Sequence, residues 1–239
     1  MYRLAIAIAI VAVALVGCSK SDSADIKTSG IHATITARAE GAGQTRVTAE
    51  LFLGNPIDLN FVELSADDQL VARHAGQSQT MTESQLLNIV SYSAAFPTEA
   101  ANESFEVAFE RGPDDVSAPS STCTLPAPFT LAAPPSSSSR AAAFTLTWSP
   151  SGTADRMTVT VDGTCIDLAS IPVTGDPGTV TIAAGTIRKK MAQGETIVDS
   201  CQAQIHIERA RPGQLDAHYG KGGDITAIQA RVVTFTTAP

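Results

Sequence analysis

Residues 157–161 read Met-Thr-Val-Thr-Val, an alternation of apolar and polar side chains with a period of two residues. Successive side chains of a β-strand point to opposite faces, so this pattern predicts a half-buried strand. Similar or β-branched-rich segments recur along the chain, at 34–37, 47–53, 105–109, 143–148, 180–182, 204–207 and 231–235. Gly, Pro, Asn and Asp separate them, and a helical turn is expected only around Thr82–Asn88. The sequence therefore predicts an all-β fold.

The chain also contains an internal repeat. Sliding the sequence by 109 positions aligns residues 54–94 with residues 163–203 without a gap. Ten aligned pairs are identical: Gly54/Gly163, Ile57/Ile166, Asp58/Asp167, Leu59/Leu168, Asp67/Asp176, Val71/Val180, Ala75/Ala184, Gly76/Gly185, Ser91/Ser200 and Ala94/Ala203. Self-similarity at a fixed period indicates a repeated structural unit. We expect two copies of one β domain, in which Ile57 superposes on Ile166 and Gly76 on Gly185.

Strand number and spacing suggest the kind of domain. Each copy has roughly a hundred residues and about seven short strands, and so resembles an immunoglobulin-like β-sandwich. The antibody order Cys-Trp-Cys is absent, because Trp148 precedes both Cys165 and Cys201. A single barrel or one larger jelly roll is the alternative, but neither explains the repeat. The expected division is a signal peptide at 1–17, a lipidated tether at 18–26, sandwich domains at 27–112 and 126–239, and a linker at 113–125 between them.

The N-terminus indicates export. Leu4 to Val16 is an unbroken apolar run of 13 residues that follows Arg3. A transmembrane helix needs about 20 apolar residues, so this run is typical of a signal peptide. It ends in Leu15-Val16-Gly17-Cys18, which resembles the lipobox of bacterial lipoproteins. The resemblance implies cleavage after Gly17 and lipid on Cys18; an ordinary cleaved signal with a chance cysteine is the alternative. In a Gram-negative host, Ser19 after the lipid cysteine implies the outer membrane.

The charge of the chain excludes one class of partner. The sequence has 24 Asp and Glu against 16 Lys and Arg, a net charge of −8. Removing residues 1–17 takes away only Arg3 and makes the balance more negative. Nucleic-acid binding depends on basic side chains at the phosphates, so no nucleic-acid partner is expected. An acidic surface is not attracted to anionic lipid headgroups either, so the membrane is expected to hold the protein through its covalent lipid.

Three cysteines follow Cys18. Exported proteins meet oxidising conditions, so one disulfide and one leftover thiol are expected. In a seven-stranded sandwich, Cys165 would follow the third strand of the second copy and Cys201 would open the sixth, an antiparallel neighbour. The sandwich resemblance therefore implies the pair Cys165–Cys201. Cys123 is left unpaired, and no basic neighbour in the sequence lowers its thiol pKa, so it is not expected to be a nucleophile.

No motif indicates catalysis. Ser149-Pro150-Ser151-Gly152 has turn composition, and no G-x-S-x-G elbow occurs. Gly220-Lys221 resembles part of a phosphate loop but lacks its upstream glycine and its hydroxyl. We expect residues 218–224 to form a hairpin loop between the last two strands. The histidines have none of the usual zinc-ligand spacings: His32, His74, His206 and His218. The expectation is no catalytic site, no metal site and no cofactor.

Loop carboxylates offer one alternative role. Aspartates suited to loops are numerous: Asp58, Asp67, Asp68, Asp114, Asp115, Asp162, Asp167 and Asp176. Carboxylate oxygens are calcium ligands, so calcium at the domain junction is the second hypothesis, although specific calcium spacings are absent. Trp148 ends a strand with alternating apolar residues and is expected in the core rather than on a sugar-binding platform.

The function expected from these patterns is non-catalytic. The chain is expected to be a lipid-anchored protein of the bacterial cell envelope, with a structural or protein-binding role and another envelope or host protein as partner. A calcium-binding or small-ligand-binding lipoprotein is the second hypothesis. An enzyme without a recognisable motif is the third.

Overall fold

The computed structural model describes residues 19–54, 60–191 and 196–239. In this part of the chain the helices are two three-residue 3-10 turns, and none could cross a membrane. The all-β prediction is confirmed. The expected signal peptide, the expected lipid attachment residue Cys18 and the repeat residues Ile57, Asp58 and Leu59 lie outside the described residues.

The elements are β1 (Ser19–Asp22), η1 (Ser23–Asp25), η2 (Thr28–Gly30), β2 (Ile31–Ala39), β3 (Thr45–Leu53), β4 (Asn60–Glu63), β5 (Gln69–His74), β6 (Gln77–Thr80), β7 (Thr82–Leu86), β8 (Ile89–Phe96), β9 (Ser104–Glu110), β10 (Ala118–Thr124), β11 (Thr130–Leu131), β12 (Ser137–Ser139), β13 (Phe144–Ser149), β14 (Arg156–Gly163), β15 (Ile166–Ile171), β16 (Thr179–Ile182), β17 (Cys201–Pro212) and β18 (Asp224–Ala238).

Alternation in the sequence becomes burial of one strand face. In β14, Met157, Val159 and Val161 are buried, whereas Thr158 and Thr160 between them are partly exposed. All nine residues of β2 follow the same rule and bury every second side chain. These strands form because one face can join a hydrophobic core while the other stays in water.

The strands form sandwiches around two separate cores. Eleven strands make one sheet, with β1-β4-β3-β2-β18-β17-β14-β15 in order and β7, β8 and β12 attached beside this path. The four-stranded sheet β10-β9-β5-β6 covers one end of it and encloses the first core. The strands β11-β13-β16 cover the other end and enclose the second core.

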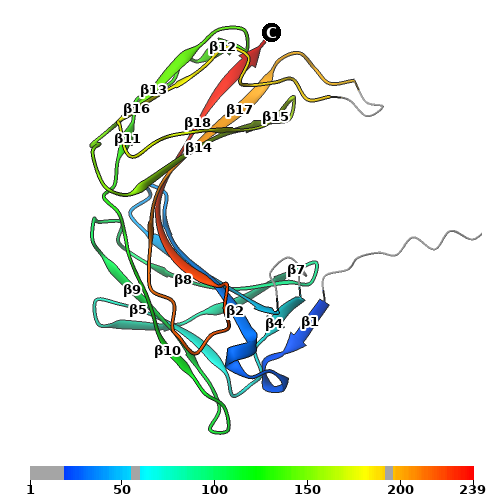
Figure 1. The fold of residues 1–239 in the computed structure, drawn as a ribbon, viewed down its shortest axis with the longest axis vertical. Helices are drawn as coiled ribbons and strands as arrows, with labels where there is room; N and C mark the ends of the chain where they lie inside the picture. The colour runs from blue at the N-terminus through cyan, green and yellow to red at the C-terminus, as the bar shows by residue number, and fades with distance from the viewer. Residues whose placement is uncertain (1–18, 55–59, 192–195) are drawn as a thin grey trace, which may run out of the picture.

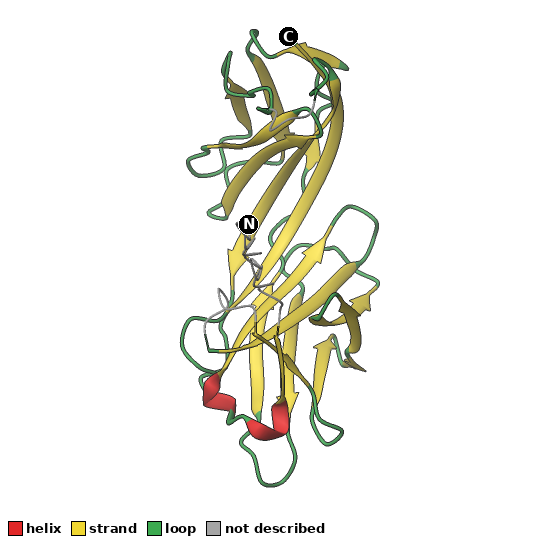
Figure 2. Ribbon diagram, turned by 90° about the vertical axis from the view of Figure 1, so that its right-hand side faces the viewer, coloured by secondary structure: helices red, strands yellow, loops and turns green. Residues whose placement is uncertain are grey.

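The molecule is a curved body of two lobes (Figures 1 and 2). We call residues 19–125 and 212–229 the lower lobe, and residues 126–211 and 230–239 the upper lobe. In Figure 1 the eleven-stranded sheet lies on the inner side of the curve, and the smaller sheets lie on the outer side. We call the uncovered face of the eleven-stranded sheet the inner face.

The hairpin of β17 and β18 runs through both lobes. The first residues of β18, 224–229, pair in parallel with β2 in the lower lobe. Its last residues, 236–238, pair with β12 in the upper lobe. Along most of its length, from Thr226 to Thr237, β18 is paired with β17 at twelve positions. The two sandwiches therefore share one sheet, and a strand late in the sequence completes the first sandwich.

Three local predictions were wrong. Residues 118–124, expected in a linker, form β10 and pair with β9. Residues 19–25, expected in a flexible tether, form β1 and η1, with β1 paired to β4. The expected helical turn at 82–88 is instead β7 and the turn after it, paired with β8. In each segment, pairing with another strand decides the conformation: β8 for β7, β9 for β10 and β4 for β1.

The repeat survives in strand order. The strands β3, β4, β5 and β8 of the first half correspond, 109 residues later, to β14, β15, β16 and β17. Gly76 and Gly185 both have positive φ, 78° and 76°, in turns that follow β5 and β16. The pairing register is not shared: Thr48 lies opposite Ser93, whereas Met157 lies opposite Arg209. The division into domains that fold independently stays a prediction.

Candidate functional site

The described chain begins beside the predicted anchor, which lies at Cys18. Ser19, the next residue, is the first of β1 and lies opposite Asn60 of β4. The Lys20 ammonium lies 2.8 Å from the Glu63 carboxylate on the neighbouring strand. The Asp22 carboxylate then accepts a hydrogen bond from the backbone of Ala24 at 2.9 Å and caps η1. The protein is thus folded from its first described residue.

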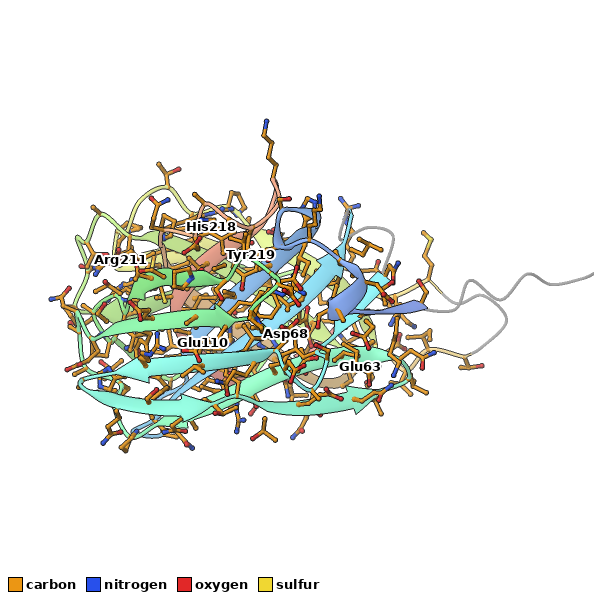
Figure 3. The ribbon with its side chains drawn as sticks, turned by 90° about the horizontal axis from the view of Figure 1, so that it is seen from below. Glu63, Asp68, Glu110, Arg211, His218 and Tyr219 are labelled. Atoms are coloured by element: carbon orange, nitrogen blue, oxygen red, sulfur yellow. A yellow bond between two sulfur atoms is a disulfide. The ribbon has the colours of Figure 1, made fainter. Side chains whose placement is uncertain are left out.

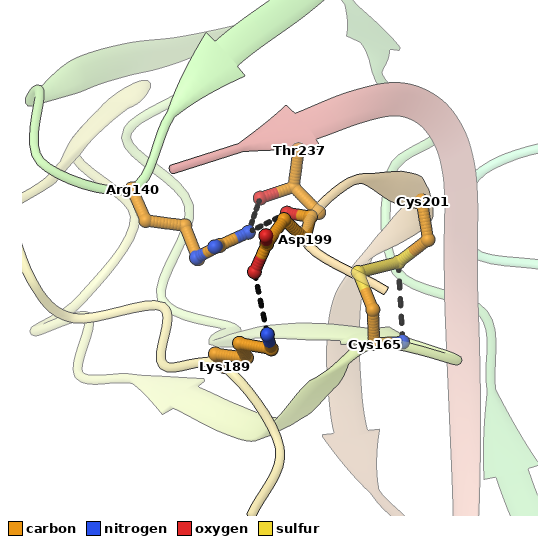
Figure 4. The surroundings of a disulfide bond; sticks show 6 residues. All are labelled: Arg140, Cys165, Lys189, Asp199, Cys201 and Thr237. Carbon is orange, nitrogen blue, oxygen red and sulfur yellow. Dashed lines mark hydrogen bonds and ion pairs between the residues drawn. A yellow bond between two sulfur atoms is a disulfide. The ribbon is translucent and has the colours of Figure 1, made fainter. Parts of the chain in front are cut away.

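The disulfide between Cys165 and Cys201 is present, as predicted (Figure 4). Cys165 follows β14 and Cys201 opens β17, two antiparallel neighbours in which Gly163 lies opposite Ala203. The Cα atoms are 5.8 Å apart, and the Cys165 amide donates to the Cys201 sulfur at 3.2 Å. The bond fixes the start of β17 to the turn between β14 and β15.

An ion-pair network lies next to the disulfide. The Lys189 ammonium pairs with the Asp199 carboxylate, and Arg140 donates to the Asp199 carbonyl at 2.8 Å (Figure 4). The Lys189 side chain lowers the pKa of Asp199 by hydrogen bonding and charge. Both groups are substantially exposed, so this network is a surface feature.

Cys123 is a buried free thiol. It lies in β10 opposite Phe105 and is 3% exposed. Burial raises the pKa of its thiol to about 12. A thiol that is neither ionised nor accessible is a poor nucleophile. The geometry supports the sequence interpretation of Cys123.

The histidines lie apart, in separate settings. His74 stacks on Phe105 with ring centroids 4.7 Å apart. His206 Nε2 lies 2.9 Å from an Asp162 oxygen, without the alignment of a hydrogen bond. His218 pairs with Asp216 at 2.8 Å in the loop after β17. Among the described residues, no group of three or more His, Cys, Asp or Glu could hold a metal ion.

The loop that contains the phosphate-loop-like residues joins the last two strands, as expected, and packs into the lower lobe. Tyr219 is 6% exposed and stacks on Phe109, with ring planes 4° apart. Figure 3 shows Tyr219 and His218 side by side on this loop. A Cβ on Gly213 would lie 2.2 Å from the Thr122 carbonyl oxygen, so only glycine allows this approach. The loop has a structural role.

Several aspartates of the calcium hypothesis are paired with basic groups. Asp68 lies 3.0 Å from the Arg111 guanidinium, which also contacts Asp115 at 3.2 Å. Asp176 lies 2.8 Å from Arg209, with both side chains fully buried. These carboxylates already have cationic partners, so the structure offers no reason to place calcium on them.

The guanidinium of Arg211 joins the two lobes at their junction. Arg211 of β17 makes two bonds to Asp155 of the upper lobe, at 2.7 and 2.9 Å. The same guanidinium donates to Asn102 and to the Leu125 carbonyl of the lower lobe. Arg211 therefore acts as a clamp between the lobes.

The inner face is polar and rich in threonine. Cross-strand partners there include Thr36 and Thr48, and Thr36 and Thr226. Other threonines alternate outward on β2 and β14: Thr34, Thr158 and Thr160. Short hydroxyl side chains leave a sheet face open to a partner and offer donors and acceptors. We therefore regard the inner face as the candidate binding surface.

Charged groups lie at the middle of this face. Arg38 of β2 reaches over β18 to Glu208 of β17 at 2.6 Å and contacts Glu40 at 2.7 Å. Burial raises the pKa of Glu50 on β3. A shallow hollow of about 390 Å³ lies over the β2–β3 hairpin, lined by Thr36, Arg38, Glu40, Ala42, Gln44, Arg46 and Thr48. These side chains can form hydrogen bonds with a polar partner surface, and the lining contains no cysteine, serine or histidine.

Neither the inner face nor the arginine clamp is predictable from the sequence alone. The outward threonines were visible as the polar half of each alternating strand. Which strands share a sheet depends on contacts such as β18 with β2, far apart in the chain. The expected core position of Trp148 agrees with the structure: it is 4% exposed and donates to Asp176 at 2.7 Å.

No protein-family model and no curated protein matches this chain.

Proposed function

We propose that this chain is a lipid-anchored protein of the bacterial cell envelope, held by lipid on Cys18, with no catalytic role. It presents its inner face to another envelope or host protein. The observation that carries the binding role is the single sheet that runs through both lobes, with an uncovered, threonine-rich face.

Rigidity supports a binding role for this face. Arg211 forms hydrogen bonds to both lobes, and β18 runs through both lobes within one sheet. A surface that keeps its shape loses little conformational entropy when it binds. The polar side chains of the inner face, Arg38 and Glu208 among them, suit a hydrated protein–protein contact.

The state of the reactive groups supports the absence of catalysis. Cys123 is buried with a raised pKa, and Asp68 and Asp176 are each paired with an arginine. The hollow on the inner face has no cysteine, serine or histidine among its lining residues.

The anchor is tested by metabolic labelling with palmitate. Wild-type protein is expected to incorporate label and to fractionate with membranes. The Cys18→Ser variant is expected to incorporate none and to remain unprocessed or soluble. Wild-type protein without label would exclude the lipid anchor.

The binding surface is tested by photo-crosslinking in cells. A photoreactive amino acid at Thr160, on the inner face, is expected to give a discrete crosslinked product. The matched control is Thr145, an exposed strand threonine on the opposite sheet of the upper lobe. Crosslinks at Thr145 and none at Thr160 would place the contact on the outer side and exclude the inner face.

A further inference from the structure

The hairpin of β7 and β8 ends in an exposed apolar tip. Leu86, Leu87 and Ile89 are 70%, 84% and 41% exposed. Leu86 lies opposite Ile89, so Leu87 and Asn88 form a two-residue turn. Both have positive φ, 50° and 66°, a conformation in which glycine, asparagine or aspartate is usual. A leucine at this position strains the turn and exposes apolar surface to water. Such exposed apolar surface indicates that the tip contacts another molecule.

The start of β1 lies at the end of the sheet where β3 ends. Ser19 is paired with Asn60, the first residue of β4. The next residue of β4, Phe61, lies opposite Phe52 near the end of β3. Ser19 is therefore at the Leu53 end of this sheet.

The hairpin tip points to the same end. β8 runs antiparallel to β3, with Ala49 opposite Tyr92, so Ile89 lies three residues further towards that end. The Tyr92 hydroxyl accepts a hydrogen bond from the Leu64 amide at 2.9 Å and holds β8 beside the end of β4. In Figure 1, β7 and β1 lie on the same side of the lower lobe.

The chain between the proposed anchor at Cys18 and this end of the sheet is very short. Consecutive Cα atoms are about 3.8 Å apart, and Ser19, which follows Cys18, is already in β1. Lipid on Cys18, which is the proposed function on which this inference rests, would hold the Ser19 end of the lower lobe at the bilayer surface. The apolar tip is then on the membrane side.

We infer that the tip formed by Leu86, Leu87 and Ile89 inserts into the outer part of the bilayer that holds the anchor. The lipid and the tip are two separate contacts, and together they fix the orientation of the lower lobe on the membrane. Leucine and isoleucine partition into lipid without help from charge. The chain is acidic and has no general attraction to anionic headgroups, so insertion is expected to be insensitive to salt.

The experiment places a fluorophore at the tip of the full lipidated protein. The Leu87→Cys variant is labelled with an environment-sensitive dye and reconstituted in phosphatidylcholine vesicles with or without brominated acyl chains. The new thiol is the reactive one, since Cys165 and Cys201 are bonded and Cys123 is buried. The control is Val116→Cys, 60% exposed, whose backbone is hydrogen-bonded to Thr28 beyond the other end of β1.

Brominated lipid is expected to quench most of the Leu87 signal and little of the Val116 signal, at low and high salt alike. If palmitate is incorporated but Leu87 is quenched no more than Val116, the inference is overturned and the anchor stands. A blue-shifted Leu87 signal in native membranes without quenching by brominated lipid in vesicles indicates a protein contact and also overturns it. Wild-type protein without palmitate overturns the anchor and the inference together.

Discussion

Arg209 and Asp176 form an ion pair in which both side chains are fully buried, with Nη2 and Oδ2 2.8 Å apart. The guanidinium also donates to the carbonyls of Ala127 and Pro150, each at 2.7 Å, and lies over the Phe129 ring. The outer sheet of the upper lobe consists of β11, β13 and β16. The pair therefore joins β17 to the segments that precede β11 and β16 and to the segment that follows β13. The lower lobe has an equivalent arrangement, in which Arg111 pairs with a buried aspartate and lies over Phe109.

Breaking this pair on one side is expected to be costly. The Asp176→Asn variant leaves the Arg209 charge buried without its counterion, and the expected loss is about 3–5 kcal/mol in the free energy of unfolding. The matched control is Glu208→Gln, which breaks a partly exposed pair with Arg38 and is expected to cost less than about 1 kcal/mol. Urea denaturation of both variants measures the difference. Equal losses would show that burial of the pair is irrelevant to stability.

The buried aspartates also predict loss of stability in acid. Burial alone would raise the pKa of Asp176, but hydrogen bonds from Trp148 and Thr153 and the charge of Arg209 outweigh burial and lower the pKa. The pKa of Asp68 is also lowered: burial opposes ionisation, but hydrogen bonds from Ser23 and Arg111 outweigh burial.

A lowered pKa in the folded state means that the unfolded chain binds protons first as the pH falls. The stability from both aspartates is complete above the unfolded aspartate pKa of about 3.9 and is lost as the pH falls through the lower, folded values. Unfolding free energies measured from neutral pH downward should fall below about pH 4. The Asp176→Asn variant should lose less over the same range, and an unchanged slope would contradict this assignment.

The disulfide is expected to stabilise the upper lobe. The bond closes a separation of 36 residues, and loop-entropy estimates give about 3–4 kcal/mol for a loop of this size. The Cys201→Ser variant should unfold at correspondingly lower urea concentration. A reducing agent should destabilise the wild type by a similar amount and leave the variant unchanged. Sensitivity of the variant to reductant would mean that another disulfide forms.

The thiol of Cys123 is expected to be inert in the folded protein. Its pKa is raised to about 12 by burial, and it packs in β10 against the lower core. Iodoacetamide should leave Cys123 unmodified in native protein and alkylate it after denaturation. Mass spectrometry of tryptic peptides measures both. Fast native modification would show that β10 opens readily.

The sequence predicted the features that depend on local pattern. Alternation in residues 157–161 identified β14, and the order of strands around Cys165 and Cys201 identified the disulfide. Features that depend on which strand a segment pairs with were not predictable. Ser19–Asp22 and Ala118–Thr124 have the composition of flexible segments, yet each pairs with a strand of the lower lobe.

The candidate site shows the same limit. The outward threonines of β2 and β14 were visible in the sequence, but their common face requires that β18 and β17 lie between those strands. Arg211 gave no sequence signal for a clamp, because its partners Asp155 and Asn102 lie in different lobes. Pairing over such separations is set by the whole core rather than by local preference.

The shared hairpin predicts how a fragment of residues 126–239 behaves. All residues of the upper core, Trp148 among them, lie within the fragment, so cooperative β-type unfolding is expected. Tyr219 and Ile225 belong to the lower core, and residues 224–229 pair with β2, which the fragment lacks. Hydrogen exchange should therefore be fast for amides of residues 224–229 in the fragment and slow in the full chain, while β14 stays protected in both.

If the fragment shows no cooperative transition, the lobes form one folding unit. If residues 224–229 stay protected in the fragment, pairing with β17 alone suffices and the lower lobe contributes nothing to their stability.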